Sequence, residues 1–176
     1  MLMKYMKSCR SGRMRFYYYV IAVVVLILDF ISKKWIVNNM KIGEQFSVIG
    51  DFFLITSHRN RGAAFGILQD QRVFFIIITV VIVGAIIWYA HSVRKSGTVL
   101  LLAGLGLVLG GAIGNFVDRA RFGEVVDFFK FNFGSYTFPI FNVADSAIVV
   151  GVILIMLDTL LSIKEEKKGK VAVENE

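Results

Sequence analysis

Two aspartates, Asp127 and Asp145, have the residue type and setting that best fit catalytic chemistry in this sequence. Asp127 stands among apolar residues at 125–129, and Asp145 follows Asn142 by three positions, in the first turn of an expected helix. Two carboxyl groups that share a site do not both ionise easily, so one keeps a proton while the other acts as a base. Such a pair can activate water against an amide carbonyl and later protonate the leaving nitrogen. The residues therefore indicate an aspartate-pair hydrolase.

A structural interpretation of the same two residues stays open at this point. In that interpretation Asp145 only caps a helix, and Asp127 pairs with Arg119 or Arg121. Arg119 lies one position after Asp118 and four after Asn115, so these three side chains fall on one side of a helix end.

Metal-dependent and serine-dependent chemistry have little support. The two histidines, His58 and His91, fall on opposite sides of a membrane in the expected topology, so they form neither a metal-binding pair nor a serine triad. The single cysteine, Cys9, excludes a disulfide framework and a cysteine-rich zinc site. The sequence contains no HExxH or GxSxG motif. We therefore expect no metal.

A second pair of charged residues, Asp29 and Lys33, lies inside an apolar segment. Their spacing and order allow them to pair on one helix face. A charged side chain inside a membrane segment costs about 2.5–3.5 kcal/mol on insertion scales, so the pair either holds the helix in register or orients a substrate in a polar cavity. Ser32 beside Lys33 suggests a serine–lysine dyad, but adjacent helix residues point about 100° apart.

The composition indicates a membrane protein. Of the 176 residues, 56% are hydrophobic and 19% are charged, whereas soluble domains average roughly 45–50% and about 25%. Apolar segments at about 16–37, 73–90, 98–117 and 140–163 are each long enough to cross a bilayer. The sequence therefore predicts one domain over 1–176 with four transmembrane helices.

The net charge of +7 follows this topology. Basic clusters precede the first segment, occupy the turn at Arg94 and Lys95, and recur in the tail after the fourth segment. By the positive-inside rule, both termini and the middle turn lie in the cytoplasm. The basic residues form no compact face with interleaved aromatic residues, so we expect no nucleic-acid partner.

Two loops, 38–72 and 118–139, then lie outside the cell membrane. Phe129, Phe131 and Phe133 alternate with polar residues, which is typical of a strand, and 52–56 also has strand character. The predicted fold class is an all-α membrane protein with a small extracytoplasmic β-sheet or flap. In the third segment, Gly110 and Gly114 continue a four-residue spacing from Gly106 that lets helices approach closely. These glycines lack the spacing of a dinucleotide-binding loop.

Five sequence blocks resemble the lipoprotein signal peptidases (signal peptidase II), which are bacterial membrane aspartic proteases. The blocks are Asp-Phe-Ile-Ser-Lys (29–33), Asn-Arg-Gly-Ala-Ala-Phe-Gly (60–66), Gly-Gly-Ala-Ile-Gly-Asn-Phe-Val-Asp-Arg (110–119), Val-Val-Asp-Phe (125–128) and Phe-Asn-Val-Ala-Asp-Ser (141–146). Any one block is weak evidence, but five in the same order make a specific match over nearly the whole chain.

The resemblance assigns roles to individual residues. It implies that Asp127 and Asp145 are the catalytic pair and that Asp118 is structural, with Gly110 and Gly114 in the same block. The residues that it implies line the site or bind substrate are Asn60, Asn115, Arg119 and Asn142, with Asp29 and Lys33 in the first-helix motif.

The resemblance also implies a substrate and a location. The substrates are prolipoproteins whose cysteine already carries diacylglycerol, cleaved just before that cysteine near the outer face of the bacterial cytoplasmic membrane. The implied reaction requires no metal or organic cofactor. The enzyme then contacts membrane lipid, and its oligomeric state stays open. The alternative is a small proton- or ion-coupled transporter that uses the same charged residues as a path.

Overall fold

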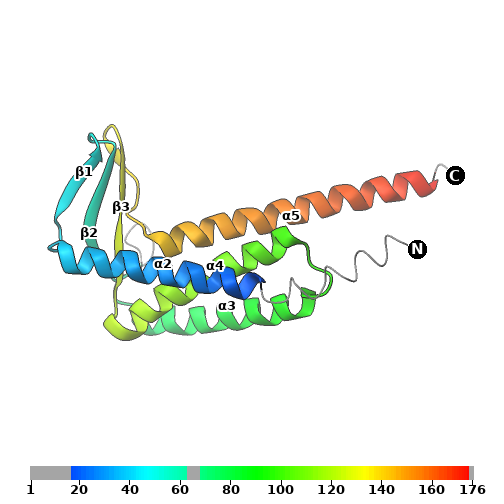
Figure 1. Ribbon diagram of the computed structural model, residues 1–176, viewed down its shortest axis with the longest axis horizontal. Coiled ribbons are helices and arrows are strands. Elements are labelled where there is room, and N and C mark those ends of the chain that lie inside the picture. Colours follow the sequence, from blue (N-terminus) through cyan, green and yellow to red (C-terminus); the bar gives the residue numbers. More distant parts are fainter. Residues whose placement is uncertain (1–16, 63–67, 175–176) are drawn as a thin grey trace.

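The computed structural model describes residues 17–62 and 68–174, with side chains to residue 164. Four helices run side by side, and a small sheet lies across one end of them (Figure 1). The helices are α2 (Tyr17–Asn39), α3 (Arg72–Val93), α4 (Val99–Phe122) and α5 (Val143–Glu174). The strands are β1 (Gln45–Ile49), β2 (Phe53–Asn60), β3 (Val125–Phe133) and β4 (Tyr136–Thr137). The basic residues before position 17, Cys9, and residues 63–66 of the second block lie outside the described residues.

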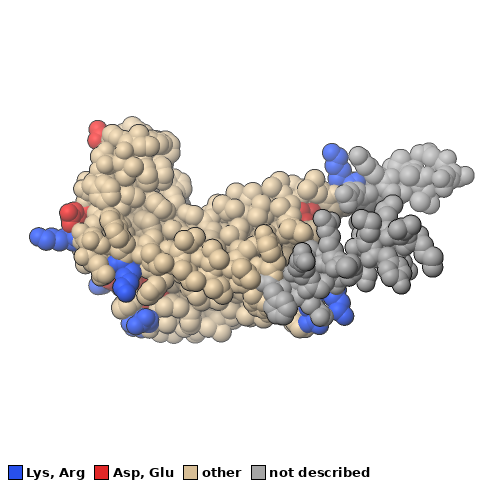
Figure 2. All heavy atoms as spheres, in the orientation of Figure 1, with Lys and Arg blue, Asp and Glu red and all other residues tan. Residues whose placement is uncertain are grey.

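Three of the helices are long and apolar enough to cross a membrane: α3, α4 and the Val143–Lys164 part of α5. The fourth predicted span, α2, has the length but carries Asp29, Lys33 and Lys34. The prediction of four transmembrane helices is therefore confirmed for three. The charged side chains seen in Figure 2 gather toward the two ends of the molecule and leave an uncharged zone between them.

Two helix boundaries differ from the sequence prediction. The third segment was expected to end near 117, but α4 continues to Phe122. It ends at Gly123, whose φ of 77° is left-handed and whose N–H donates to Arg119 O at 3.1 Å. Asp118 therefore lies on a helix and not in the predicted loop 118–139. The fourth segment was expected at 140–163, but α5 begins at Val143 and continues to Glu174, because the polar residues after 163 include good helix formers.

The central helix is α4, and small residues allow its neighbours to approach on two sides. A Cβ added to Gly106 or Gly110 would lie 2.6 Å from a backbone carbonyl oxygen of α2. On the other side, a Cβ added to Gly104 would lie 2.7 Å from Gly151 O of α5. In α4, 67% of the apolar span is buried, against 6% in α3. The predicted close-packing role of Gly106 and Gly110 is thus confirmed, whereas the second face was not predicted.

The sheet is antiparallel, in the order β1-β2-β3-β4. It confirms the predicted strands at 52–56 and 129–133, whereas β1 was not predicted from the sequence. Val126 and Phe128 of β3 pack against Ile36 and Met40 at the end of α2. Farther along β3, Phe129 forms a bridge with Phe141, just before α5. These contacts fix the start of β3 between two helix ends.

Candidate active site

Asp127 is a buried carboxyl group at the start of β3, with 2% of its surface exposed. Its Oδ1 accepts a hydrogen bond from Asn142 Nδ2 at 2.7 Å, and its Oδ2 accepts one from Asn60 Nδ2 at 2.9 Å. Burial and, to a smaller extent, the negative charge of Asp145 raise the pKa of Asp127, the two amide hydrogen bonds oppose the rise, and the net pKa is about 7. Asp127 can therefore hold or release a proton near neutral pH.

The arginine partner that the structural interpretation gave to Asp127 is not found. Among the described residues, no ion pair joins Asp127 to Arg119 or Arg121. Asparagine side chains occupy both of its oxygens instead.

Asp145 and Asn142 cap the start of α5 reciprocally. The Asp145 N–H donates to Asn142 Oδ1 at 2.9 Å, and the Asn142 N–H donates to Asp145 Oδ2 at 3.2 Å. This arrangement confirms that Asn142 is the N-cap and that Asp145 stands three positions later. The Asn142 side chain is fully buried and also donates to Asp127. One residue therefore connects both aspartates.

Asn115 connects Asp145 to a buried charge network. Its Nδ2 donates to Asp145 Oδ1 at 2.7 Å, and its Oδ1 accepts from Lys33 Nζ at 3.0 Å and from Asn142 Nδ2 at 3.2 Å. Asn115 lies on α4, whereas Asp145 lies in the first turn of α5. The third and fourth predicted segments thus meet at this amide.

Lys33 is the centre of that network. Its Nζ lies 2.7 Å from Asp29 Oδ2, which confirms the predicted pair on one helix face. It also lies 2.9 Å from Asp118 Oδ2, an ionic contact whose angles fall outside hydrogen-bond geometry. Asp29 Oδ1 in turn accepts the backbone N–H of Ala144 at 3.0 Å. Because the network ties α2, α4 and α5 together and ends on Asn115, it both fixes helix register and supports the aspartate site.

Arg119 and Asn60 meet at Gly62. Arg119 Nη2 donates to Gly62 O at 3.1 Å, and Asn60 Oδ1 accepts from Gly62 N–H at 2.9 Å. The Arg119 guanidinium also lies over the Phe75 ring of α3, 4.7 Å from its centroid. Direct contacts therefore join the other predicted site residues to the aspartates or to one another, whereas Arg119 reaches Asn60 only through Gly62. Both predicted glycines of α4 face α2. Gly110 lies against the α2 backbone away from the aspartates, and a Cβ on Gly114 would lie 2.5 Å from Asp29 Oδ2, next to the charge network.

Hydrogen bonds also hold two further polar residues, Ser32 and Asp158. Ser32 Oγ donates to Asp29 O at 2.9 Å, so its hydroxyl is not paired with Lys33. The Asp158 side chain is buried and accepts a hydrogen bond from Thr98, the N-cap of α4. The described residues contain no group of three or more His, Cys, Asp or Glu side chains that could hold a metal ion.

Sequence reasoning missed the backbone partners of the site. The Ala144 N–H and the Gly62 carbonyl both hold functional side chains, yet neither residue type suggests such a role. The spacing of Asn142 and Asp145 was the available signal for Ala144, since a helix N-terminus offers free N–H groups.

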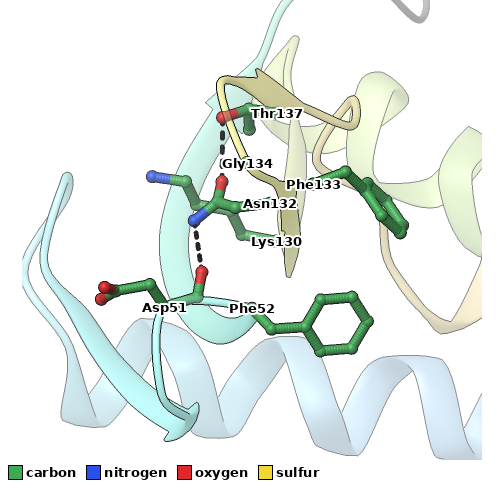
Figure 3. A pocket seen from close by; sticks show the side chains of 7 residues that line it. All are labelled: Asp51, Phe52, Lys130, Asn132, Phe133, Gly134 and Thr137. Carbon is green, nitrogen blue, oxygen red and sulfur yellow. Dashed lines mark hydrogen bonds between the residues drawn. The ribbon is translucent and has the colours of Figure 1, made fainter.

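A hollow of about 680 Å³ lies at the far end of the sheet, apart from both aspartates (Figure 3). Its central side chain, Asn132, donates to Asp51 O at 2.8 Å and accepts from Thr137 Oγ1 at 2.8 Å. These polar groups bond to one another and so brace the strand ends. Its lining comprises Asp51, Phe52, Lys130, Asn132, Phe133, Gly134 and Thr137.

Comparison with known proteins shows what this chain is similar to in sequence and fold. The family model described as signal peptidase (SPase) II matches residues 21–161. A lipoprotein signal peptidase of Bacillus pumilus (strain SAFR-032) is 51% identical over 153 residues, which cover 87% of this chain and 98% of that protein. Two solved structures of bacterial membrane enzymes have TM-scores of 0.76 and 0.72, at 43% and 44% identity. They cover 85% and 82% of this chain, and 90% and 92% of their own chains are matched.

Proposed function

The chain belongs to the signal peptidase II family, and from this premise we propose that Asp127 and Asp145 are the catalytic pair of an aspartic endopeptidase. The protein is a bacterial membrane protease that removes the signal peptide from prolipoproteins. The transporter alternative is not favoured. The observation that carries the proposal is Asn142, which contacts both aspartates from one buried position.

The two carboxyl groups have different surroundings, which supports different roles. Asp127 is almost fully buried with its pKa raised to about 7, so it enters the reaction as the protonated acid. Asp145 is partly exposed, so water can reach it, and it accepts hydrogen bonds from the Asn115 side chain and from the Asn142 backbone N–H. Asp145 is therefore the base.

The chemical steps follow from these roles. Asp145 takes a proton from water while the water oxygen bonds to the carbonyl carbon of the scissile peptide, and Asp127 gives its proton to the carbonyl oxygen. In the resulting tetrahedral diol, Asp127 takes a proton back from a hydroxyl group. The C–N bond then breaks as Asp145 returns its proton to the leaving nitrogen. Both carboxyl groups finish in their starting states.

The surface of α2 supports a fourth membrane span. Its exposed residues include Val24, Ile27 and Ile31, whereas Asp29 and Lys33 are buried and paired with each other. Apolar side chains thus face lipid while Asp29 and Lys33 face the other helices, as in a bundle inside a bilayer. With the basic clusters in the cytoplasm, both termini are cytoplasmic and the aspartates lie near the extracytoplasmic face.

Within this function, the finer proposal is that the substrate cysteine carries diacylglycerol and that cleavage falls just before it. The bilayer delivers both the apolar signal helix and the lipid to a site at the membrane boundary. Arg119 and the site asparagines then bind the peptide backbone and the lipid head region, since unpaired polar groups there are costly.

A gel-shift cleavage assay in detergent tests the proposal. It compares diacylglyceryl-modified prolipoprotein with its unmodified form, using wild type, Asp127→Asn and Asp145→Asn. Asp51→Asn, which alters an exposed aspartate at the tip of the sheet, is the matched control. We expect wild type and the control to cleave the lipidated substrate, and both site variants to fold but not cleave. Robust cleavage by either site variant would remove the assignment of the pair.

A further inference from the structure

Two arginines lie where α3 begins and α4 ends, outside the candidate active site. Arg72 is the first residue of α3, and its Nη2 donates to Ala120 O in the last turn of α4 at 2.6 Å. Its Cδ would lie 3.5 Å from a Cβ added to Gly123, where α4 ends. Arg121 belongs to that same last turn. These two residues, Arg72 and Arg121, form what we call the arginine pair.

The arginine pair is not neutralised by nearby carboxylates. Among the described residues, neither member has an acidic partner within 4.0 Å. The neighbouring Glu124 lies 3.7 Å from Arg59 Nε and 3.2 Å from Arg61 Nε, so it already has two cationic partners. The helix ends at the sheet therefore carry surplus positive charge, and basic side chains are visible in this part of Figure 2.

Exposed apolar side chains surround the arginine pair. Phe122 is 65% exposed and Val73 is 69% exposed, and the Arg121 guanidinium lies over the Phe122 ring, 5.4 Å from its centroid. Only 6% of the α3 span is buried in the protein, so lipid covers this helix. Arginine and aromatic side chains gather where a membrane helix meets the lipid headgroups. We therefore expect the arginine pair and Phe122 to lie at headgroup level.

We propose that the arginine pair binds the phosphodiester of an anionic membrane phospholipid whose acyl chains run along α3. The geometry of guanidinium N–H groups suits hydrogen bonds to phosphate oxygens. Arg72 has five N–H donors and gives one of them to Ala120 O, so others are available for a phosphate. The first turn of α3 contains no acidic residue, and Gln71 makes no side-chain cap, so its backbone N–H groups add donors to the same anion.

The bound lipid has a structural consequence for the neighbouring site. It bridges α3 and α4 within a turn of Arg119, whose guanidinium stacks on Phe75 of α3. This inference does not depend on which residues catalyse, because it concerns lipid retention alone.

Native mass spectrometry of the detergent-purified protein tests the inference. The probes are dioleoylphosphatidylglycerol, dioleoylphosphatidylcholine and inorganic phosphate, added at equal concentrations. The variants are the double substitution Arg72→Gln/Arg121→Gln and the control Arg94→Gln, which alters the other end of α3. We expect wild type and the control to retain one phosphatidylglycerol, and the double variant to retain at least about tenfold less, since it has lost both guanidinium groups.

Other results would overturn the inference. Retention of phosphatidylcholine equal to that of phosphatidylglycerol would mean that headgroup charge is not recognised, and displacement by inorganic phosphate would exclude a lipid-specific site. Equal retention by wild type and the double variant would remove the arginine pair from the site. If the double variant folds poorly, phosphatidylglycerol retention by wild type is measured at raised ionic strength instead. Salt screens exposed charge contacts, so retention should fall. Unchanged phosphatidylglycerol retention in high salt would refute the proposal.

Discussion

The hydrogen bond from Asn60 to Asp127 makes a quantitative prediction about pH dependence. This 2.9 Å bond lowers the pKa of Asp127 against the larger effect of burial, and together the effects give a pKa of about 7. A hydrogen bond to a charged group is worth about 1.5–3 kcal/mol, and one pKa unit is about 1.4 kcal/mol, so Asn60→Ala raises the Asp127 pKa by about one to two units. Because Asp127 works in its protonated form, activity falls as pH rises through its pKa.

The measurement is the pH profile of kcat/KM for cleavage of lipidated prolipoprotein, which reports ionisations of the free enzyme. At pH 8, a group with a pKa of about 7 is protonated in about one molecule in eleven, whereas a pKa of about 8 gives about half. We therefore expect the alkaline limb of Asn60→Ala to move upward by at least about one unit, although the maximum rate falls. The shape of the profile, and not its height, is the readout.

The matched control is Asn39→Ala. Asn39 is exposed at the end of α2, where its Nδ2 donates to Trp35 O, and its loss should leave the alkaline limb in place. An unmoved or lowered limb in Asn60→Ala would refute the reasoning, either because Asn60 does not tune Asp127 or because Asp127 is not the acid.

Three further predictions concern folding. Lys33→Met leaves the buried charge of Asp29 without its cation and should lower the unfolding free energy by about 3–5 kcal/mol, measured by denaturant titration in detergent; a loss below about 1 kcal/mol contradicts this. Gly110→Ala places a Cβ 2.6 Å from an α2 carbonyl and should cost about 1–3 kcal/mol, whereas the control Gly84→Ala meets no atom within 4 Å and should cost nothing; equal melting temperatures would disprove the close contact. Asp118→Asn should lower yield but leave the folded fraction active in the cleavage assay, and a folded, inactive protein would move Asp118 into the site.

Much of the fold and part of the site followed from sequence patterns. The apolar runs predicted all four helices, and the spacing of Asn142 and Asp145 predicted the cap that orients Asp145, because helix termini leave N–H groups that such side chains satisfy. Asp29 and Lys33 were likewise predictable as neighbours from helical geometry. Each of these predictions concerns residues that are only a few positions apart in the sequence.

The remaining features depend on contacts between distant segments. Asn60 and Asp127 are 67 positions apart, so no local sequence pattern predicts their hydrogen bond. Arg119 and Arg121, which are close to Asp127 in the sequence, were the partners that the sequence suggested. Asp158 is buried because Thr98 lies opposite it, 60 positions away. The strand β1 alternates polar and apolar residues only over 45–48, the shortest run that identifies a strand, and every one of its residues is exposed.

The position of Asp127 between two separate loops has a consequence for biosynthesis. Its partner Asn60 precedes α3, and its partner Asn142 follows β3, so two helices must cross the membrane before the three side chains meet. Contacts between such distant segments form late, since the chain must close a long loop first. Under the proposed catalytic assignment, a chain still leaving the ribosome is proteolytically silent.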